Sequence, residues 1–136
     1  FYGREVSGDR YKWCGVFVSW CANHVGILDD VVPRYENCTN AQIAYQNQNR
    51  LHLTESGYEP KAGDTFFYGN AGADHTGLVL AFDKVNKMVY TIEGNIGDAV
   101  RVLKRPLSSI YSFGSNGGTT FGIIPNNTDK FTGKIV

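Results

Sequence analysis

Apolar residues near the start of the chain follow the spacing of a helix. Between residues 14 and 25 they recur three or four positions apart, and Gly26 stands where a helix commonly ends. The apolar positions are Cys14, Phe17, Val18, Cys21 and Val25. Val16 and Trp20 widen the apolar surface beyond this stripe. We therefore expect the helix at the centre of the domain, with its first cysteine on the buried face.

A second, more polar helix is predicted after a loop over residues 29–38, which contains the stop signal Pro33. Thr39 followed by Gln42 matches a T-x-x-Q capping box, and residues 41–49 continue with a modest amphipathic pattern. Because apolar positions are few, this helix is expected to lie on the surface.

Beyond a turn over residues 59–64, the periodicity changes to that of β-strands. Strands are predicted over residues 65–68, 76–82, 88–93, 99–104 and 120–124. No helical pattern interrupts them, and Gly- and Asn-containing connections separate them. Helices followed by strands predict an α+β domain in which N-terminal helices pack on a C-terminal antiparallel sheet.

The turn over residues 83–87 joins two of these strands into a predicted hairpin, in which facing residues share one side of the sheet. In one even register, where the numbers of facing residues sum to an even number, Asn95 lies opposite His75 and Glu93 opposite Gly77. The neighbouring even register places the glutamate opposite the histidine. An odd register would put both polar side chains on the other face.

Composition limits the kinds of partner and compartment. The 136 residues suffice for one domain with a substantial core, and thirteen basic residues balance thirteen acidic ones. We therefore expect no nucleic-acid partner, and the short apolar runs argue against membrane insertion, which needs roughly 18 apolar residues. The chain begins with Phe1, so residues 1–136 are interpreted as a single domain excised from a larger protein. Separately, we expect the domain to be a monomer.

Three cysteines leave at least one thiol unpaired. Cys14 and Cys21 on one helix would be separated by a rise of about 10 Å, more than the roughly 7 Å that a disulfide spans. A bridge between Cys21 and Cys38 stays geometrically open. These residues with His24 lack the short paired spacing of structural zinc sites, and no acidic loop matches a calcium motif, so no metal or cofactor is expected.

A helix start is a favourable place for a reactive thiol. The helix dipole and a nearby imidazolium both stabilise a thiolate, and Cys14 occupies the first turn of the predicted helix. His75 stands at the beginning of a strand, and Glu93 or Asn95 could orient its ring. Taken singly, each residue is more often structural, but together they form a candidate nucleophile, base and orienter.

Four stretches, in this order, resemble the motifs of one family. They are WCGVFVSWC at 13–21, PKAGD at 60–64, DHTGLV at 74–79 and IEGN at 92–95. These stretches resemble the CHAP domain, the cysteine, histidine-dependent amidohydrolases/peptidases, and the resemblance covers about residues 1–124. It implies a papain-like fold without a cofactor. It also implies Cys14 as nucleophile, His75 as general base and acid, Glu93 as orienter and Asn95 as a further polar member of the site.

The resemblance also implies a substrate, bacterial peptidoglycan, and a secreted or cell-wall-associated protein of bacterial or phage origin. Cleavage by an endopeptidase is favoured over N-acetylmuramoyl-L-alanine amidase activity. Trp13, Tyr68 and Asp74 are expected to bind substrate, with Tyr111 as another candidate wall. Gly15 stands where many relatives carry Ala, which should leave room beside the nucleophile. Two alternatives stay open: a small-amide amidase of the glutathionylspermidine type, and an inert module that binds the cell wall or a partner.

Overall fold

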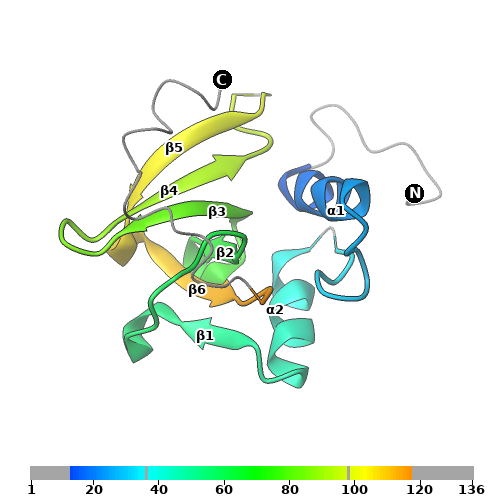
Figure 1. The fold of residues 1–136 in the computed structure, drawn as a ribbon, viewed down its shortest axis with the longest axis horizontal. Helices are drawn as coiled ribbons and strands as arrows, with labels where there is room; N and C mark the ends of the chain where they lie inside the picture. The colour runs from blue at the N-terminus through cyan, green and yellow to red at the C-terminus, as the bar shows by residue number, and fades with distance from the viewer. Residues whose placement is uncertain (1–12, 36, 98, 118–136) are drawn as a thin grey trace.

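The structure, a computed structural model, describes residues 13–35, 37–97 and 99–117 (Figure 1). Two helices come first, α1 (Cys14–His24) and α2 (Cys38–Asn47). The strands that follow are β1 (Leu51–Leu53), β2 (Thr65–Tyr68), β3 (His75–Asp83), β4 (Met88–Glu93), β5 (Arg101–Pro106) and β6 (Ile110–Gly114). Short 3₁₀ turns are η1 (Thr54–Ser56), η2 (Asn70–Gly72) and η3 (Leu107–Ser109).

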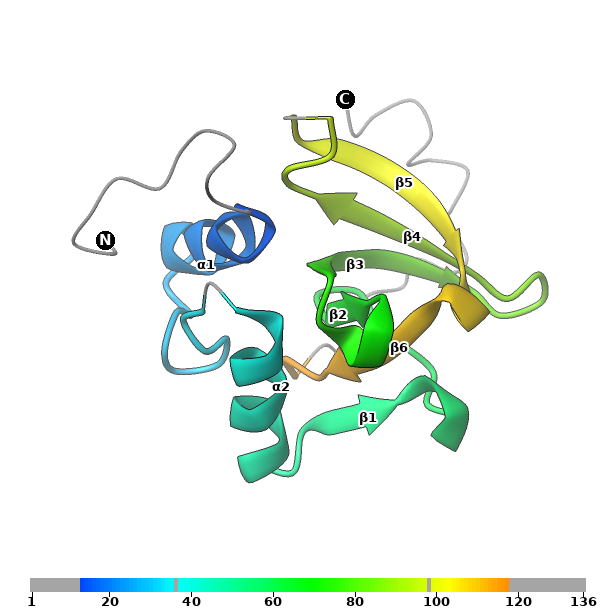
Figure 2. The same ribbon diagram turned by 180° about the vertical axis from the view of Figure 1, so that it is seen from behind.

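The six strands form one antiparallel sheet in the order β1-β6-β2-β3-β4-β5. Both views show α1 and α2 together on one side of it (Figure 1, Figure 2). This arrangement confirms the predicted α+β, papain-like fold. Among the residues that the structure describes, no helix has the length and apolar character needed to cross a membrane.

Strand prediction succeeded best in the centre of the sheet. The bounds of β2 and β4 match the prediction, whereas β5 begins two residues later than expected. The edge strand β1 and the inner strand β6 were missed, and the strand predicted over residues 120–124 lies outside the described residues. The missed strands have only three and five residues, too few for an alternating pattern to stand out from the polar residues and glycines around them.

Each face of the sheet packs against its own hydrophobic core. On the helix side, Val18 of α1 and Tyr45 of α2 belong to a core with Phe67 of β2. Strand residues such as Phe66 and Phe113 form the second core on the opposite face. Because successive residues of a strand point to opposite faces, the two neighbouring phenylalanines of β2 divide these cores.

The buried face of α1 differs from the predicted stripe. Cys14 and Val18 are buried as expected, but Cys21 is only half-buried and Val25 is 68% exposed. Ser19 is fully buried instead, since its hydroxyl donates to the backbone carbonyl of Tyr35 and accepts from its backbone N–H. A helix that is apolar almost all round does not show by spacing alone which side is covered.

The beginning of α2 corrects the predicted capping box. Asn37, not Thr39, is the N-cap, and its side chain accepts from the N–H groups of Thr39 and Asn40 at 2.8 and 3.1 Å. Gln42 instead points inward, donating to the carbonyl of Ala71 and accepting from the hydroxyl of Ser112. One face of α2 is therefore buried, and the helix ties the η2 loop to the sheet.

The β3–β4 hairpin changes register along its length. Next to the turn, Asp83 faces Met88, which is an odd register. A β-bulge at Leu80 adds one residue to β3, and beyond it Leu78 faces Ile92 in an even register. The predicted even register therefore holds at the end of the hairpin that carries the candidate site residues.

Candidate active site

Cys14 is the first residue of α1 and is 3% exposed. Its sulfur forms hydrogen bonds with the thiol of Cys38, the side chain of His75 and the backbone N–H of Thr76. The N-cap residue, Trp13, provides no side-chain cap. The positive end of the helix therefore lies at the sulfur without a capping side chain between them.

The pKa of Cys14 is lowered from 9.0 to about 4. The hydrogen bond from Cys38 is the largest cause; burial opposes the change, and the hydrogen bond and charge of His75 add to the lowering. Both neighbours favour the charged form of the sulfur over the neutral thiol. Cys14 is therefore a thiolate at neutral pH.

His75 is the first residue of β3 and pairs with Tyr68 of β2. Its Nε2 lies 2.7 Å from Oε1 of Glu93 and donates to it, because an ionised carboxylate can only accept. Nδ1 is therefore the ring nitrogen left to face Cys14. Burial works to lower the pKa of His75, but hydrogen bonds with Cys14 and Glu93 outweigh it and raise the pKa to about 9.

Glu93 ends β4 and its side chain is fully buried. The chain leaves room for it at Gly77, where an added Cβ would lie 3.0 Å from Cγ of Glu93 and 2.8 Å from the carbonyl oxygen of Ile92. A residue with a side chain at position 77 would push the carboxylate away from the histidine. The hydrogen bond to His75 confirms the predicted face of Glu93; its catalytic role stays a prediction.

Two further residues hold the carboxylate of Glu93, and no local sequence pattern predicts the contact of either. Arg105 of β5 donates from Nε to Oε2 at 2.6 Å and from Nη2 to Oε1 at 2.7 Å, and Thr91 donates its hydroxyl to Oε2. Burial alone would raise the pKa of Glu93, but the hydrogen bonds from Arg105, His75 and Thr91 lower it to about 2.

Tyr35 fills the space beside the nucleophile that Gly15 was expected to leave open. A Cβ added to Gly15 would meet the Tyr35 ring at 3.1 Å. The phenolic oxygen of Tyr35 lies 2.7 Å from the hydroxyl of Thr76, whose backbone N–H reaches Cys14. The glycine therefore admits an aromatic wall behind the nucleophile.

Each of the remaining predicted site residues lies within two residues of a candidate catalytic residue in the chain or pairs with one in the sheet. Asn95 follows β4 in the left-handed region, with φ of 65°. Asp74 is exposed and accepts from the backbone N–H of Asn70 at 3.0 Å, which closes the β2–β3 loop. Trp13 lies over Gly94, and the ring of Tyr68 lies 4.5 Å from the guanidinium carbon of Arg105. Substrate contacts of Trp13, Tyr68 and Asp74 stay predictions.

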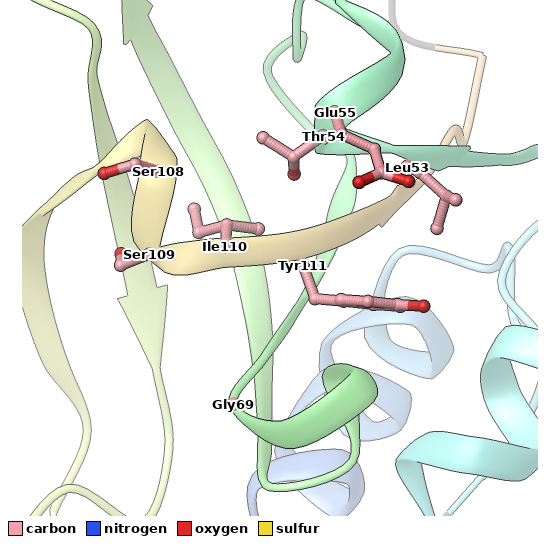
Figure 3. A pocket seen from close by; sticks show the side chains of 8 residues that line it. All are labelled: Leu53, Thr54, Glu55, Gly69, Ser108, Ser109, Ile110 and Tyr111. Carbon is pink, nitrogen blue, oxygen red and sulfur yellow. The ribbon is translucent and has the colours of Figure 1, made fainter.

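A separate cavity of about 370 Å³ lies between η1 and the segment from η3 to β6 (Figure 3). Tyr111, a candidate wall of the substrate groove, lines it together with Glu55 and Ser109. None of the predicted catalytic residues does. The cavity is therefore distinct from the hydrogen-bonded centre around Cys14.

None of the three cysteines is part of a disulfide among the described residues, so Cys38 is a neighbour of Cys14 rather than a disulfide partner of Cys21. In the part of the chain that the structure describes, no three His, Cys, Asp or Glu side chains are grouped to hold a metal ion. The chemistry at hand is that of a thiolate beside an imidazolium, which suits nucleophilic attack followed by proton donation.

The family model of the CHAP domain matches residues 6–95, about two-thirds of the chain. Comparisons with curated proteins and with solved structures found no match. CHAP domains are typically amidases or peptidases, and the match supports amide hydrolysis on peptidoglycan in general terms. With the motifs, the fold and the family model in agreement, the chain belongs to the CHAP domain family.

Proposed function

We propose that this domain is a cysteine hydrolase that cuts a peptide bond of bacterial peptidoglycan through an acyl-enzyme. The observation that carries the proposal is the continuous contact from Cys14 through His75 to Glu93, with a sulfur whose pKa is lowered to about 4. A buried structural cysteine would have a raised pKa, as Cys21 does because of burial.

In the proposed reaction, the Cys14 thiolate attacks the scissile carbonyl. The oxyanion that forms lies at the start of α1, where the first N–H groups have no partner within the helix. His75 then donates its proton to the leaving amine, and a water molecule hydrolyses the thioester. Glu93 keeps Nδ1 of the histidine directed toward the sulfur throughout.

Substrate binding and location follow from the same proposal. Trp13, which precedes Cys14, and Tyr68, which pairs with His75, would line the substrate groove, with Asp74 at its edge. Peptidoglycan lies outside the cytoplasmic membrane, so the domain would act as a secreted or wall-associated protein of a bacterium or phage. All three proposed catalytic groups come from one chain, so a monomer suffices.

The test is digestion of purified sacculi of several wall types, with the products identified by mass spectrometry. New amino termini within a stem or cross-bridge would support an endopeptidase, whereas separation of the lactyl group from L-alanine would show an amidase. Cys14→Ser should release nothing, and Cys21→Ser serves as the matched control because Cys21 lies half-buried on the same helix. Intact sacculi from every wall type with the unmodified protein would overturn the proposal.

A further inference from the structure

Arg105 makes the most extensive side-chain contact with the buried carboxylate of Glu93. It lies in β5, at the edge of the sheet, and its side chain is 17% exposed, against 0% for the glutamate. Two hydrogen bonds, of 2.6 and 2.7 Å, join its guanidinium to both carboxylate oxygens. This two-point contact fixes the plane of the carboxylate as well as its position.

All acceptor positions of the carboxylate are occupied. Oε1 accepts from Nε2 of His75 and from Nη2 of Arg105, while Oε2 accepts from Nε of Arg105 and from the hydroxyl of Thr91. A carboxylate has about four lone-pair sites, so rotation of the group would break several bonds together. The oxygen that accepts the hydrogen bond from His75 is therefore held in place.

The charges around Glu93 alternate in sign. The titratable groups that face this region are Cys14 from α1, Tyr68 from β2, His75 from β3 and Arg105 from β5. Together with Glu93, the charged groups among them form the row thiolate, imidazolium, carboxylate and guanidinium. The guanidinium balances the carboxylate, so that the imidazolium can balance the thiolate.

Arg105 is itself held by an aromatic ring. Its guanidinium carbon lies 4.5 Å from the centroid of Tyr68, and Tyr68 pairs directly with His75 between β2 and β3. A planar guanidinium can stack on a ring and donate two parallel hydrogen bonds, which a lysine ammonium cannot do. The position therefore depends on the shape of arginine as well as on its charge.

Resting on the proposed function, we propose that Arg105 is a positioning residue of the active site, holding the Glu93 carboxylate in the orientation that directs His75 toward Cys14. Its side-chain contacts are with Glu93 and Tyr68, and not with the sulfur of Cys14 or the ring of His75. It acts through Glu93, and its removal should therefore change the reactivity of a sulfur on a different element of the fold.

The experiment compares Arg105→Gln, Arg105→Lys and the control Lys104→Gln, which removes one positive charge from the exposed neighbouring position of β5. The rate of Cys14 alkylation by iodoacetamide is measured from acid to alkaline pH, with hydrolysis of sacculi as a second readout. Loss of a nearby cation raises the pKa of each group in the row. Arg105→Gln should therefore move the acid limb, the rise in rate on the acid side of the profile, to higher pH by about one unit. Because the histidine is then less well placed, hydrolysis should slow by up to about 100-fold.

Arg105→Lys should restore the acid limb but not the full rate, and Lys104→Gln should change neither. An Arg105→Gln protein with an unchanged alkylation profile would overturn the proposal, even if it melted at a lower temperature, because a merely structural residue affects folding alone. The double variant Glu93→Gln/Arg105→Gln should be no slower than Glu93→Gln. If the unmodified protein digests no sacculi, the proposed function fails, while the alkylation profiles still decide the role of Arg105.

Discussion

The two sides of the His75 ring are built from different kinds of group. On the side of Cys14, the neighbours are neutral: the thiol of Cys38 and the hydroxyls of Tyr35 and Thr76. On the side of Glu93, the largest neighbour is the charged guanidinium of Arg105. The neutral side comes from α1, α2, their connection and Thr76 of β3, whereas the charged side comes from β4 and β5.

This difference separates two tasks. A buried charge that is paired and fully hydrogen-bonded is costly to move, so the charged side fixes the direction of the histidine. The sulfur must approach a substrate and change its bonding, so it is stabilised by weaker groups that leave it nucleophilic. Changes on the charged side should therefore affect both catalysis and folding, and changes on the neutral side mainly the pH range and packing.

Breaking the charged side should have the largest effect. In Glu93→Gln, the histidine loses its ionic acceptor and Arg105 loses its partner. We expect kcat/KM to fall by about 10²–10⁴-fold, as for loss of an orienting carboxylate, and the free energy of unfolding by about 3 kcal/mol. Kinetics on a soluble muropeptide and thermal denaturation measure the two.

The matched control is Glu59→Gln, because Glu59 pairs at the surface with Lys84, which follows the end of β3 opposite to His75. It should behave as the unmodified protein. A Glu93→Gln variant with full activity would show that direction of the histidine does not depend on the charged side.

The pH dependence of activity in the unmodified protein depends on both the neutral and the charged side of His75. Cys14 has a pKa lowered to about 4 and His75 a pKa raised to about 9, so the thiolate–imidazolium pair exists between these values. Below the window the thiolate gains a proton, and above it the histidine loses the proton that the leaving amine needs. Activity should fall about tenfold per pH unit on each side, with apparent values that belong to the pair. A flat kcat/KM profile from acid to alkaline pH would contradict ion-pair catalysis.

On both sides of the histidine, the sequence predicts the residues that a local pattern marks. Cys14, His75 and Glu93 could be predicted as candidates because helix start, strand start and hairpin alternation each have a local pattern. The even register is reached through a bulge at Leu80, and no glycine or proline marks that position. Without the bulge, the odd register beside the turn would place the glutamate on the other face.

Arg105 and Cys38 could not be predicted for a different reason. The strand holding Arg105 was expected to end at residue 104, and its contact with Glu93 depends on the β4–β5 register and on a side chain that reaches along the strand. The contact of Cys38 with Cys14 depends on the packing of α2 beside α1. Both are tertiary contacts between elements whose separate patterns carry no information about distance.

Removing the thiol of Cys38 should affect the neutral side alone. In Cys38→Ala, the pKa of Cys14 rises because its strongest stabilising hydrogen bond is lost. A hydrogen bond to a charged group is worth about 1.5–3 kcal/mol, so the acid limb should move up by about one to two pH units, with little change near pH 8. Alkylation rates and kcat/KM against pH measure this shift.

Two variants serve as controls for that shift. Cys38→Ser keeps a donor and should restore most of the acid limb, whereas Cys21→Ala should leave it in place. An unchanged limb in Cys38→Ala would show that the imidazolium alone stabilises the sulfur.

The smallest effect is expected from packing behind the nucleophile. Gly15→Ala should gain up to about 1 kcal/mol of helix propensity, yet its methyl group would press on the Tyr35 ring at 3.1 Å. That ring is held by the hydroxyl of Thr76 and by backbone bonds to Ser19, so it has little freedom to move. Overpacking typically costs about 1–3 kcal/mol, and a net destabilisation of about 1 kcal/mol is therefore expected by chemical denaturation.

A double-mutant cycle makes this last prediction specific. In a Tyr35→Leu background the ring is gone, and Gly15→Ala should become neutral or stabilising, because only the helix propensity remains. Activity measured near neutral pH should change little with Gly15→Ala itself, since no charged group moves. An equal destabilisation in both backgrounds would show that the glycine does not make room for Tyr35. The position of Cys14 would then depend on the hydrogen bonds of its sulfur and not on packing against the Tyr35 ring.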